Sequence, residues 1–101
     1  STGAERLERA AVTSTCSASP CTIASQSGSW LTNITRASTG NYSINFAAGM
    51  FSAAPTCNII ANGLIATINT NPTTSAVVID TKNTAGTSTD AQFFVQCMGP
   101  R

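Results

Sequence analysis

The sequence predicts an all-β protein, a small antiparallel β-sandwich, and three observations lead to that prediction. In residues 41–46 large apolar side chains alternate with polar ones, which is the period-two pattern of a strand with one buried face. Asn62 and Gly63 stand between two apolar runs, and this dipeptide is the strongest short-range signal for a hairpin. The remaining apolar runs have the length of strands and are bounded by Gly, Pro, Asn or Ser.

The composition indicates one domain with a polar but weakly charged surface. In its 101 residues we expect a connecting segment with a first strand at residues 1–12 and the sandwich at residues 13–101. Only 9% of the residues are charged, and the net charge of +1 provides no basic patch for nucleic acid or a membrane surface. No apolar run reaches the roughly 18 residues of a membrane span, so membrane insertion is not expected. The N-terminus lacks a signal-peptide core, so we expect either an export signal upstream of Ser1 or release by cell lysis.

The first residues allow two interpretations. Glu5 and Arg9 form an i,i+4 pair of opposite charge, which favours a short helix. The continuation through Val12 and Thr13 favours a first strand instead, because β-branched residues are enriched in strands. We prefer the strand, and in either case we expect this segment to join the domain to a preceding part of the protein.

Four cysteines in a chain rich in Ser, Thr and Asn indicate an oxidising compartment and disulfides. Of the three pairings that four cysteines allow, we prefer Cys16 with Cys21 and Cys57 with Cys97. The first pair encloses the turn-forming sequence SASP, and the second ties the segment after Pro55 to the last strand. A zinc site is the alternative for the first pair, but it lacks two nearby ligands, and the chain has no histidine.

A strand that begins at Trp30, the one tryptophan of the chain, is expected at residues 30–36. It follows a short strand at residues 22–24 and a polar turn. Trp30 and Ile34 alternate with Leu31, so apolar residues occupy both faces of this strand. We interpret Trp30 as part of the core or of a subunit interface. The alternative is a stacking platform for a sugar ring.

The strand at residues 41–46 is expected to bury one face and then to turn sharply. A turn of small residues follows it, with Gly49 available for a positive φ, before apolar residues resume and Pro55 ends the next segment. We therefore expect two antiparallel strands around a tight corner. The core residues that this pattern predicts are Tyr42, Ile44, Phe46 and Phe51.

The second half of the chain is expected to continue with strands at residues 58–61, 64–69, 76–81 and 91–98. The first two of these should pair as a hairpin around Asn62 and Gly63. The last strand carries apolar residues on both faces, which favours a central strand with a neighbouring subunit behind it. The residues that we assign to such a subunit interface are Trp30, Leu31, Phe93 and Phe94.

No catalytic residues, metal site or cofactor are expected, and the chain is not predicted to be an enzyme. Without histidine it can build neither a Ser-His-Asp triad nor a Cys-His pair. Glu5 and Glu8 lie in an N-terminal run that we expect to be exposed, and no surrounding cluster suggests a glycosidase pair. We interpret Asp80 and Asp90 as solvated loop ends; the alternative is a calcium site completed by loop carbonyls.

One segment resembles a known family. The pattern G-x-Y-x-x-x-F-x-x-G-x-F-x-x-x-P-x-C in residues 40–57 resembles the small β-sandwich heads at the C-terminal ends of phage tail-fibre and bacterial collagen-like proteins. Those heads are similar in kind to trimeric C1q/TNF-like jelly rolls. A weaker likeness extends to ASQSGSW at residues 24–30 and AQFFVQCMG at residues 91–99. The matching residues are Gly40, Tyr42, Phe46, Gly49, Phe51, Pro55 and Cys57.

The resemblance implies a jelly-roll head that assembles as a homotrimer outside the cell, on a virion tail fibre or a bacterial surface. Our leading hypothesis is a receptor-binding or adhesive head at the tip of a trimeric fibre. Its receptor would be a glycan or a protein on a host or matrix surface, and we favour a glycan because Ser, Thr and Asn can hydrogen-bond sugar hydroxyls. The alternative hypothesis is a structural trimerisation cap that nucleates and locks a fibre or a collagen-like stalk.

Overall fold

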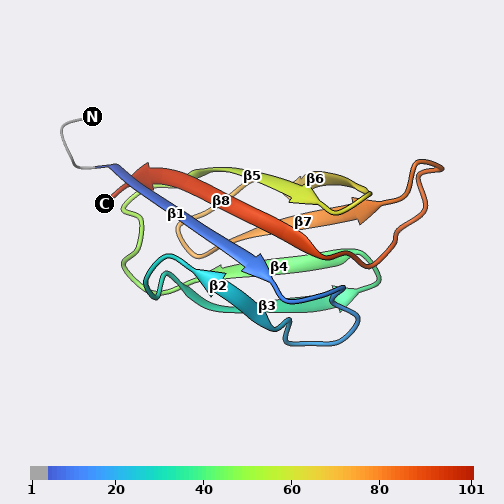
Figure 1. Ribbon diagram of the computed structural model, residues 1–101. Helices are drawn as coiled ribbons and strands as arrows, with labels where there is room; N and C mark the ends of the chain where they lie inside the picture. The colour runs from blue at the N-terminus through green and yellow to red at the C-terminus, as the bar shows by residue number, and fades with distance from the viewer. Residues whose placement is uncertain (1–4) are drawn as a thin grey trace.

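The protein is a two-layer antiparallel β-sandwich in a computed structural model that describes residues 5–101. One four-stranded sheet has the order β2-β1-β8-β5 and the other has the order β3-β4-β7-β6 (Figure 1). We call them the β1/β8 sheet and the β4/β7 sheet after their central strands. The strands are β1 (Glu5–Val12), β2 (Ile23–Gln26), β3 (Leu31–Ser38), β4 (Asn41–Phe46), β5 (Thr56–Ala61), β6 (Ile65–Thr70), β7 (Ala76–Lys82) and β8 (Phe93–Pro100).

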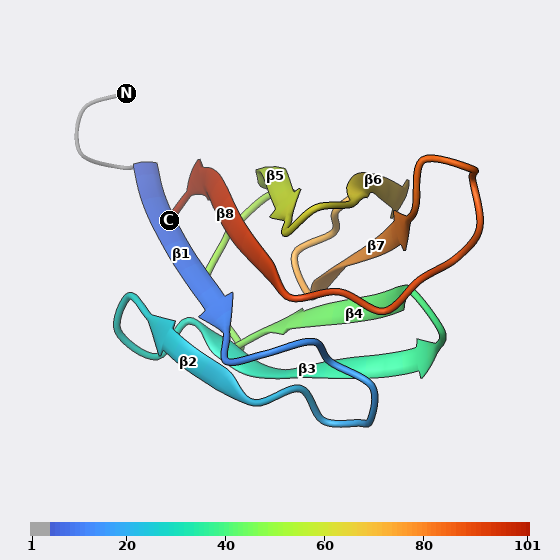
Figure 2. The same cartoon turned by 45° about the vertical axis from the view of Figure 1, so that its right-hand side comes forward.

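The predicted all-β sandwich is therefore confirmed. At one side of the sandwich β5 lies beside β6, and at the other side β2 lies beside β3 (Figures 1 and 2). Among the residues described, there is no helix long and apolar enough to cross a membrane.

Side chains from the inner faces of both sheets form one hydrophobic core. Its aromatic part joins three segments, because Phe46 stacks on Trp30 at a ring-centroid distance of 5.6 Å and meets the edge of Phe51 at 5.4 Å. Tyr42 contacts Phe93 of the opposite sheet, with ring centroids 4.9 Å apart. The four residues that the sequence assigns to the core, Tyr42, Ile44, Phe46 and Phe51, are all buried.

The first strand is confirmed as a strand rather than a helix. β1 lies between β2 and β8, and it pairs with β8 from Glu5 to Ala11. β1, which we expected in the connecting segment, is an interior strand of its sheet and so belongs to the sandwich. Residues 1–4, the remainder of the expected connecting segment, lie outside the described residues.

Both predicted disulfides, Cys16–Cys21 and Cys57–Cys97, are present and use all four cysteines. The first closes a short loop between β1 and β2. The second joins residues that stand directly opposite each other in β5 and β8, so it fixes an edge strand to a central strand.

The corner after β4 differs from the expected pair of strands. A turn does follow β4, and Gly49 adopts a positive φ of 77°. Residues 50–55 form no strand, however, because the chain crosses here from one sheet to the other. Phe51 enters the core during the crossing, and Pro55 packs closely on Gly99, where an added Cβ would lie 2.9 Å from the proline Cα.

The predicted hairpin around Asn62 and Gly63 is also wrong, although the turn itself is present. Gly63 has a φ of 74°, and the Leu64 N–H donates to the Ala61 carbonyl at 3.4 Å. The strands on either side of the turn belong to different sheets, since β5 pairs with β8 and β6 pairs with β7. The turn is therefore an arch across the sandwich, and the Cys57–Cys97 bond helps to keep β5 on β8.

The predicted subunit-interface residues require a correction. Trp30, Leu31 and Phe93 are only 1%, 7% and 3% exposed, so their apolar surface is already covered within one chain. The physical reason is an irregularity in the pairing of β3 with β4 between Leu31 and Asn33, which allows Leu31 and Ile34 to face the same core. The Trp30 ring lies in that core too, and its Nε1–H donates to the Arg9 carbonyl at 2.9 Å.

Candidate functional site

The outward sides of the two sheets are the candidate functional surfaces, and they differ in chemistry. The apolar face is the outward side of the β1/β8 sheet, formed by Leu7, Arg9, Ala11, Thr56, Asn58, Ile60, Phe94, Gln96 and Met98. The amide face is the outward side of the β4/β7 sheet, formed by Asn33, Thr35, Asn41, Ser43, Asn45, Ile65, Thr67, Asn69, Ala76, Val78, Asp80 and Lys82.

The apolar face carries exposed hydrophobic side chains in two rows. Ala11, Phe94 and Ile60 stand opposite one another on β1, β8 and β5 and form the first row. Leu7 and Met98 stand opposite each other nearer the start of β1 and form the second. Leu7, Ile60 and Met98 are 60%, 64% and 52% exposed, and a polar row of Arg9, Gln96 and Asn58 separates the two apolar rows.

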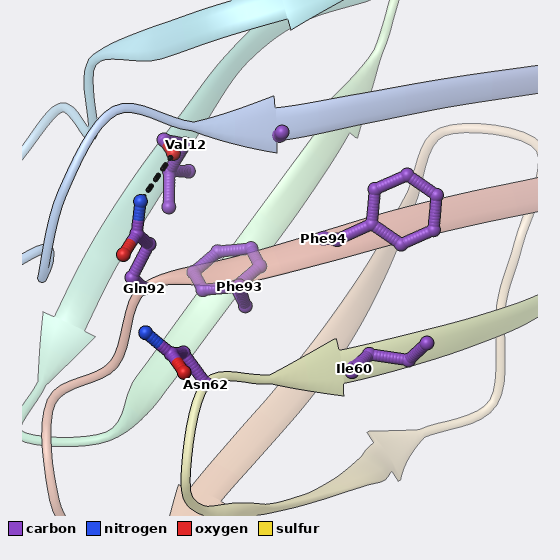
Figure 3. Close-up of a pocket in the computed structure, with 7 residues that line it drawn as sticks. Val12, Ile60, Asn62, Gln92, Phe93 and Phe94 are labelled. Atoms are coloured by element: carbon purple, nitrogen blue, oxygen red, sulfur yellow. Dashed lines mark hydrogen bonds between the residues drawn. The ribbon is translucent and has the colours of Figure 1, made fainter.

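Hollows lie on the apolar face, and the two larger ones lie at its two apolar rows. The first has a volume of about 370 Å³. Figure 3 shows Phe94 and Ile60 reaching from neighbouring strands, with the amides of Asn62 and Gln92 at one end. The Gln92 amide donates to the Thr13 carbonyl at 3.0 Å, so it is held against the chain. The second hollow, of about 350 Å³, is lined by Leu7, Thr56, Cys57, Asn58, Gln96 and Met98.

The amide face is connected by hydrogen bonds between side chains. On one part of it the Asn45 amide donates to Asn33 Oδ1 at 2.7 Å, and the Ser43 hydroxyl donates to Asn45 Oδ1 at 2.8 Å. These polar residues alternate with the buried residues of β4, so the same alternation that builds the core also aligns the amides outside.

A second group on the amide face surrounds Asp80. The amide of Asn41 on β4 donates to Asp80 Oδ1 at 2.7 Å, and the amide of Asn69 on β6 donates to Oδ2 at 2.7 Å. These hydrogen bonds, with that from Asn69 the stronger cause, lower the pKa of Asp80 below its ordinary value. The Asp80 carboxylate is therefore held in its charged form between two amides.

Asp90 lies in a different, structural cluster. The Arg36 guanidinium binds it with two nitrogen atoms, Nε on Oδ1 and one terminal nitrogen on Oδ2, both at 3.0 Å. The Gly40 N–H and the Tyr42 hydroxyl add hydrogen bonds of 2.9 and 3.1 Å to Oδ1. The hydrogen bond from Arg36 is the main reason that the pKa of Asp90 lies below its ordinary value.

The Asp90 cluster joins three loops. The Tyr42 hydroxyl also lies 2.6 Å from the Cys16 carbonyl and accepts the Ala91 N–H at 3.0 Å, and burial raises the pKa of Tyr42. Gly40 has a φ of 69°, and an added Cβ would meet the Thr81 carbonyl at 2.5 Å, so only glycine fits there.

These contacts correct the interpretation of Asp80 and Asp90 as solvated loop ends. Both carboxylates accept hydrogen bonds from nitrogen donors, from Asn41 and Asn69 in one case and from Arg36 and Gly40 in the other. Within residues 5–101 no three His, Cys, Asp or Glu side chains are close enough to hold a metal ion together. Glu8 is likewise less exposed than expected, because it accepts a hydrogen bond of 2.7 Å from Ser27.

Of the predicted interface residues, Phe94 alone lies on the apolar face. Leu7, Ile60 and Met98 were missed, and the alternation of exposed and covered residues in each strand was the available signal. That signal could not show that the three side chains share one surface, because the surface exists only once β1 and β5 both pair with β8.

Comparisons of the chain with models of known families, with curated proteins and with solved structures give no match. The function is therefore argued from the two faces themselves.

Proposed function

We propose that this domain is a receptor-binding head that assembles as a homotrimer through its apolar face, at the tip of an extracellular fibre. The observation that carries the proposal is the exposure of Leu7, Ile60 and Met98 on one side of a single sheet. Exposed apolar surface costs free energy in water at about 25 cal/mol per Å², and a partner that covers it recovers that cost. Identical copies of the chain are the simplest partner because they bring the same surface.

The strand topology supports a jelly roll of the kind that the sequence resembles. The first strand pairs with the last, β1 with β8, and β4 pairs with β7 in the other sheet. Nested antiparallel pairs of this kind, divided between two packed sheets, are typical of jelly rolls. The number three comes from the resemblance to trimeric heads, while the apolar face provides the surface for assembly. The two disulfides fit an oxidising, extracellular setting.

Light scattering coupled to size-exclusion chromatography tests the assembly. We expect a particle of three times the 10.3 kDa chain mass at micromolar concentration. Ile60→Lys should dissociate it, because a charge would then lie within the interface. Ile65→Lys is the matched control, since Ile65 is also exposed, at 50%, but belongs to the other sheet. A particle of monomer mass for the unmodified chain, or equal behaviour of both variants, would contradict assembly through the apolar face.

The second candidate function is a structural cap that nucleates and locks a trimeric stalk. The apolar face favours it as much as it favours the receptor-binding head, because both functions need trimers. A glycan array probed with the assembled domain distinguishes the two. The receptor-binding head is expected to bind at least one class of glycan, whereas a pure cap binds none.

A further inference from the structure

We propose that the amide face is a binding site for neutral glycans, in which Asp80 and the surrounding asparagines hydrogen-bond sugar hydroxyls. This inference rests on the proposed receptor-binding function and adds the surface and the ligand chemistry. It places receptor binding on the side of the sandwich opposite the face proposed for assembly, so both surfaces can be used at once.

The first argument is that the polar side chains of this face are already ordered. The amides of Asn41 and Asn69 are held by Asp80, and the amide of Asn45 is held by Asn33, each at 2.7 Å. Exposed amides normally lose rotamer freedom when a ligand binds, and that loss weakens the complex. Here the hydrogen bonds within the protein have fixed the side chains beforehand, which favours binding.

The second argument is that these side chains retain hydrogen-bonding capacity. A carboxylate accepts up to about four hydrogen bonds, and Asp80 uses one site on each oxygen for its asparagines. Asn41 donates through its nitrogen, which leaves its carbonyl oxygen as an acceptor for a hydroxyl. Sugar hydroxyls both donate and accept, so they can satisfy carboxylate, carbonyl and amide groups on one surface.

The third argument is the spacing along the strands. Asn41 stands opposite Asp80, Ser43 opposite Val78, and Asn45 opposite Ala76. Successive rows are two residues apart, and the four residue steps from Asn41 to Asn45 span about 14 Å in an extended strand. That length accommodates two linked sugar rings. The half-buried Val78 lies between the polar rows, where it can pack against the C–H groups of a ring.

The charges of the face balance each other, which favours neutral sugars. Asp80 is held within the network of asparagines, and Lys82, two residues further along β7 on the same face, balances its charge, while Arg36 is bound to Asp90. A phosphate, a sulfate or a sialic acid would meet the Asp80 carboxylate together with the Lys82 ammonium, so the face offers it no net positive charge. Nucleic acid is disfavoured for the same reason.

Titration of ¹⁵N-labelled protein with maltose, cellobiose and lactose tests the site, with the side-chain amide signals as the reporters. We expect saturable shifts of the Asn41, Asn45 and Asn69 side-chain signals with at least one of these sugars. The Asn58 side-chain signal is the internal control, because Asn58 lies on the apolar face. Asn45→Ala and Asp80→Asn should each weaken binding about tenfold. Asn58→Ala should leave the affinity for the sugar unchanged.

Thermal melting of each variant checks that it is folded before binding is measured. If Asp80→Asn does not fold, Thr67→Val replaces it, because Thr67 stands opposite Asp80 and the change removes a hydroxyl while keeping the shape. Loss of affinity in this variant supports the site, and unchanged affinity in both Thr67→Val and Asn45→Ala overturns it.

The remaining outcomes separate this inference from the proposed function. Sugar-induced shifts confined to loops or to the apolar face overturn the amide face as the site, while receptor binding stands. Binding of anionic glycans alone on the array also overturns the site, because a face on which Lys82 balances Asp80 gives anions no net attraction. If no signal moves and the array is blank while the trimer persists, the receptor-binding head itself is wrong and the structural cap remains.

Discussion

The apolar face and the amide face have the same architecture, four antiparallel strands with one side in the core. They differ in the hydrogen bonding and exposure of their outward side chains. On the amide face, Asn45 and Asp80 are each linked to neighbours by hydrogen bonds between side chains. On the apolar face, Ile60 and Met98 are more than half exposed. A polar network is stable in water without a partner, whereas exposed apolar rows gain free energy when another surface covers them. This difference is the reason that we propose protein association for one face and a ligand rich in hydroxyls for the other.

The largest expected effect comes from the core that both faces share. Phe46→Ala removes the ring that joins Trp30 to Phe51, and it should lower the free energy of unfolding by about 3 to 5 kcal/mol. Because the total stability of a small domain is itself only several kcal/mol, we expect this variant to lose the folded state near room temperature. Thermal melting followed by circular dichroism measures the effect.

Phe94→Ala is the matched control for Phe46→Ala, because Phe94 is half-buried on the apolar face. We expect it to lower the melting temperature much less than Phe46→Ala does. An unchanged melting temperature for Phe46→Ala would show that the alternation in β4 does not define the core. Equal effects of the two variants would show that the apolar face behaves as core within a single chain.

The next effect comes from the two disulfides. The Cys57–Cys97 bond closes a loop with a sequence separation of 40, and the Cys16–Cys21 bond closes one of 5. On the chain-entropy model the disulfide that closes the long loop adds about 4 kcal/mol to the free energy of unfolding, and the one that closes the short loop adds about 2 kcal/mol. The double replacement Cys57→Ala/Cys97→Ala should therefore lower the urea midpoint more than Cys16→Ala/Cys21→Ala does.

The same two variants also test which strands lose stability. β5 is an edge strand, and β8 is its hydrogen-bonded neighbour in the sheet. Without the Cys57–Cys97 bond, amide hydrogens of β5 should exchange faster while those of β4 and β7 keep their protection. Uniform loss of protection across both sheets would show that the two faces are not independently stabilised.

The features that the sequence predicted correctly depend on residues close together in the chain. The alternation at Tyr42, Ile44 and Phe46 defines β4 by itself, because one strand contains the whole pattern. The Cys16–Cys21 bond follows from a short turn between two cysteines, so it too was accessible from neighbouring residues. The class of fold follows from several such segments, none of which requires knowledge of its partners.

What the sequence missed depends on pairing between distant segments. The turn at Asn62 and Gly63 is correct, but whether it closes a hairpin or an arch depends on the competing partners β8 and β7. The burial of both Trp30 and Leu31 depends on an irregularity that interrupts the simple alternation. The apolar face was missed for the same reason, because Ile60 becomes a neighbour of Phe94 only through the register of β5 on β8.

The smallest expected effect is a loss of stability in acid, and it involves Asp80, the carboxylate of the amide face. The pKa of Asp80 is lowered by Asn69 and Asn41, and the pKa of Asp90 is lowered chiefly by Arg36. When a carboxyl pKa is lower in the folded state, the unfolded state binds more protons on acidification, so the stabilisation present above the unfolded pKa is lost as the pH falls. The free energy of unfolding should therefore decrease below about pH 4.

Replacing each carboxylate assigns that loss of stability to one part of the molecule. Asp80→Asn should remove part of the acid dependence with a small change at neutral pH, because Asp80 lies at the surface and its partners can bind water instead. Asp90→Asn should cost more at neutral pH, because it leaves the Arg36 guanidinium without its carboxylate. Urea unfolding of both variants between neutral and acidic pH measures the two slopes. If Asp80→Asn leaves the slope unchanged, the amides of Asn41 and Asn69 do not hold the charged carboxylate, and the ordered network on which the amide face depends is absent in solution.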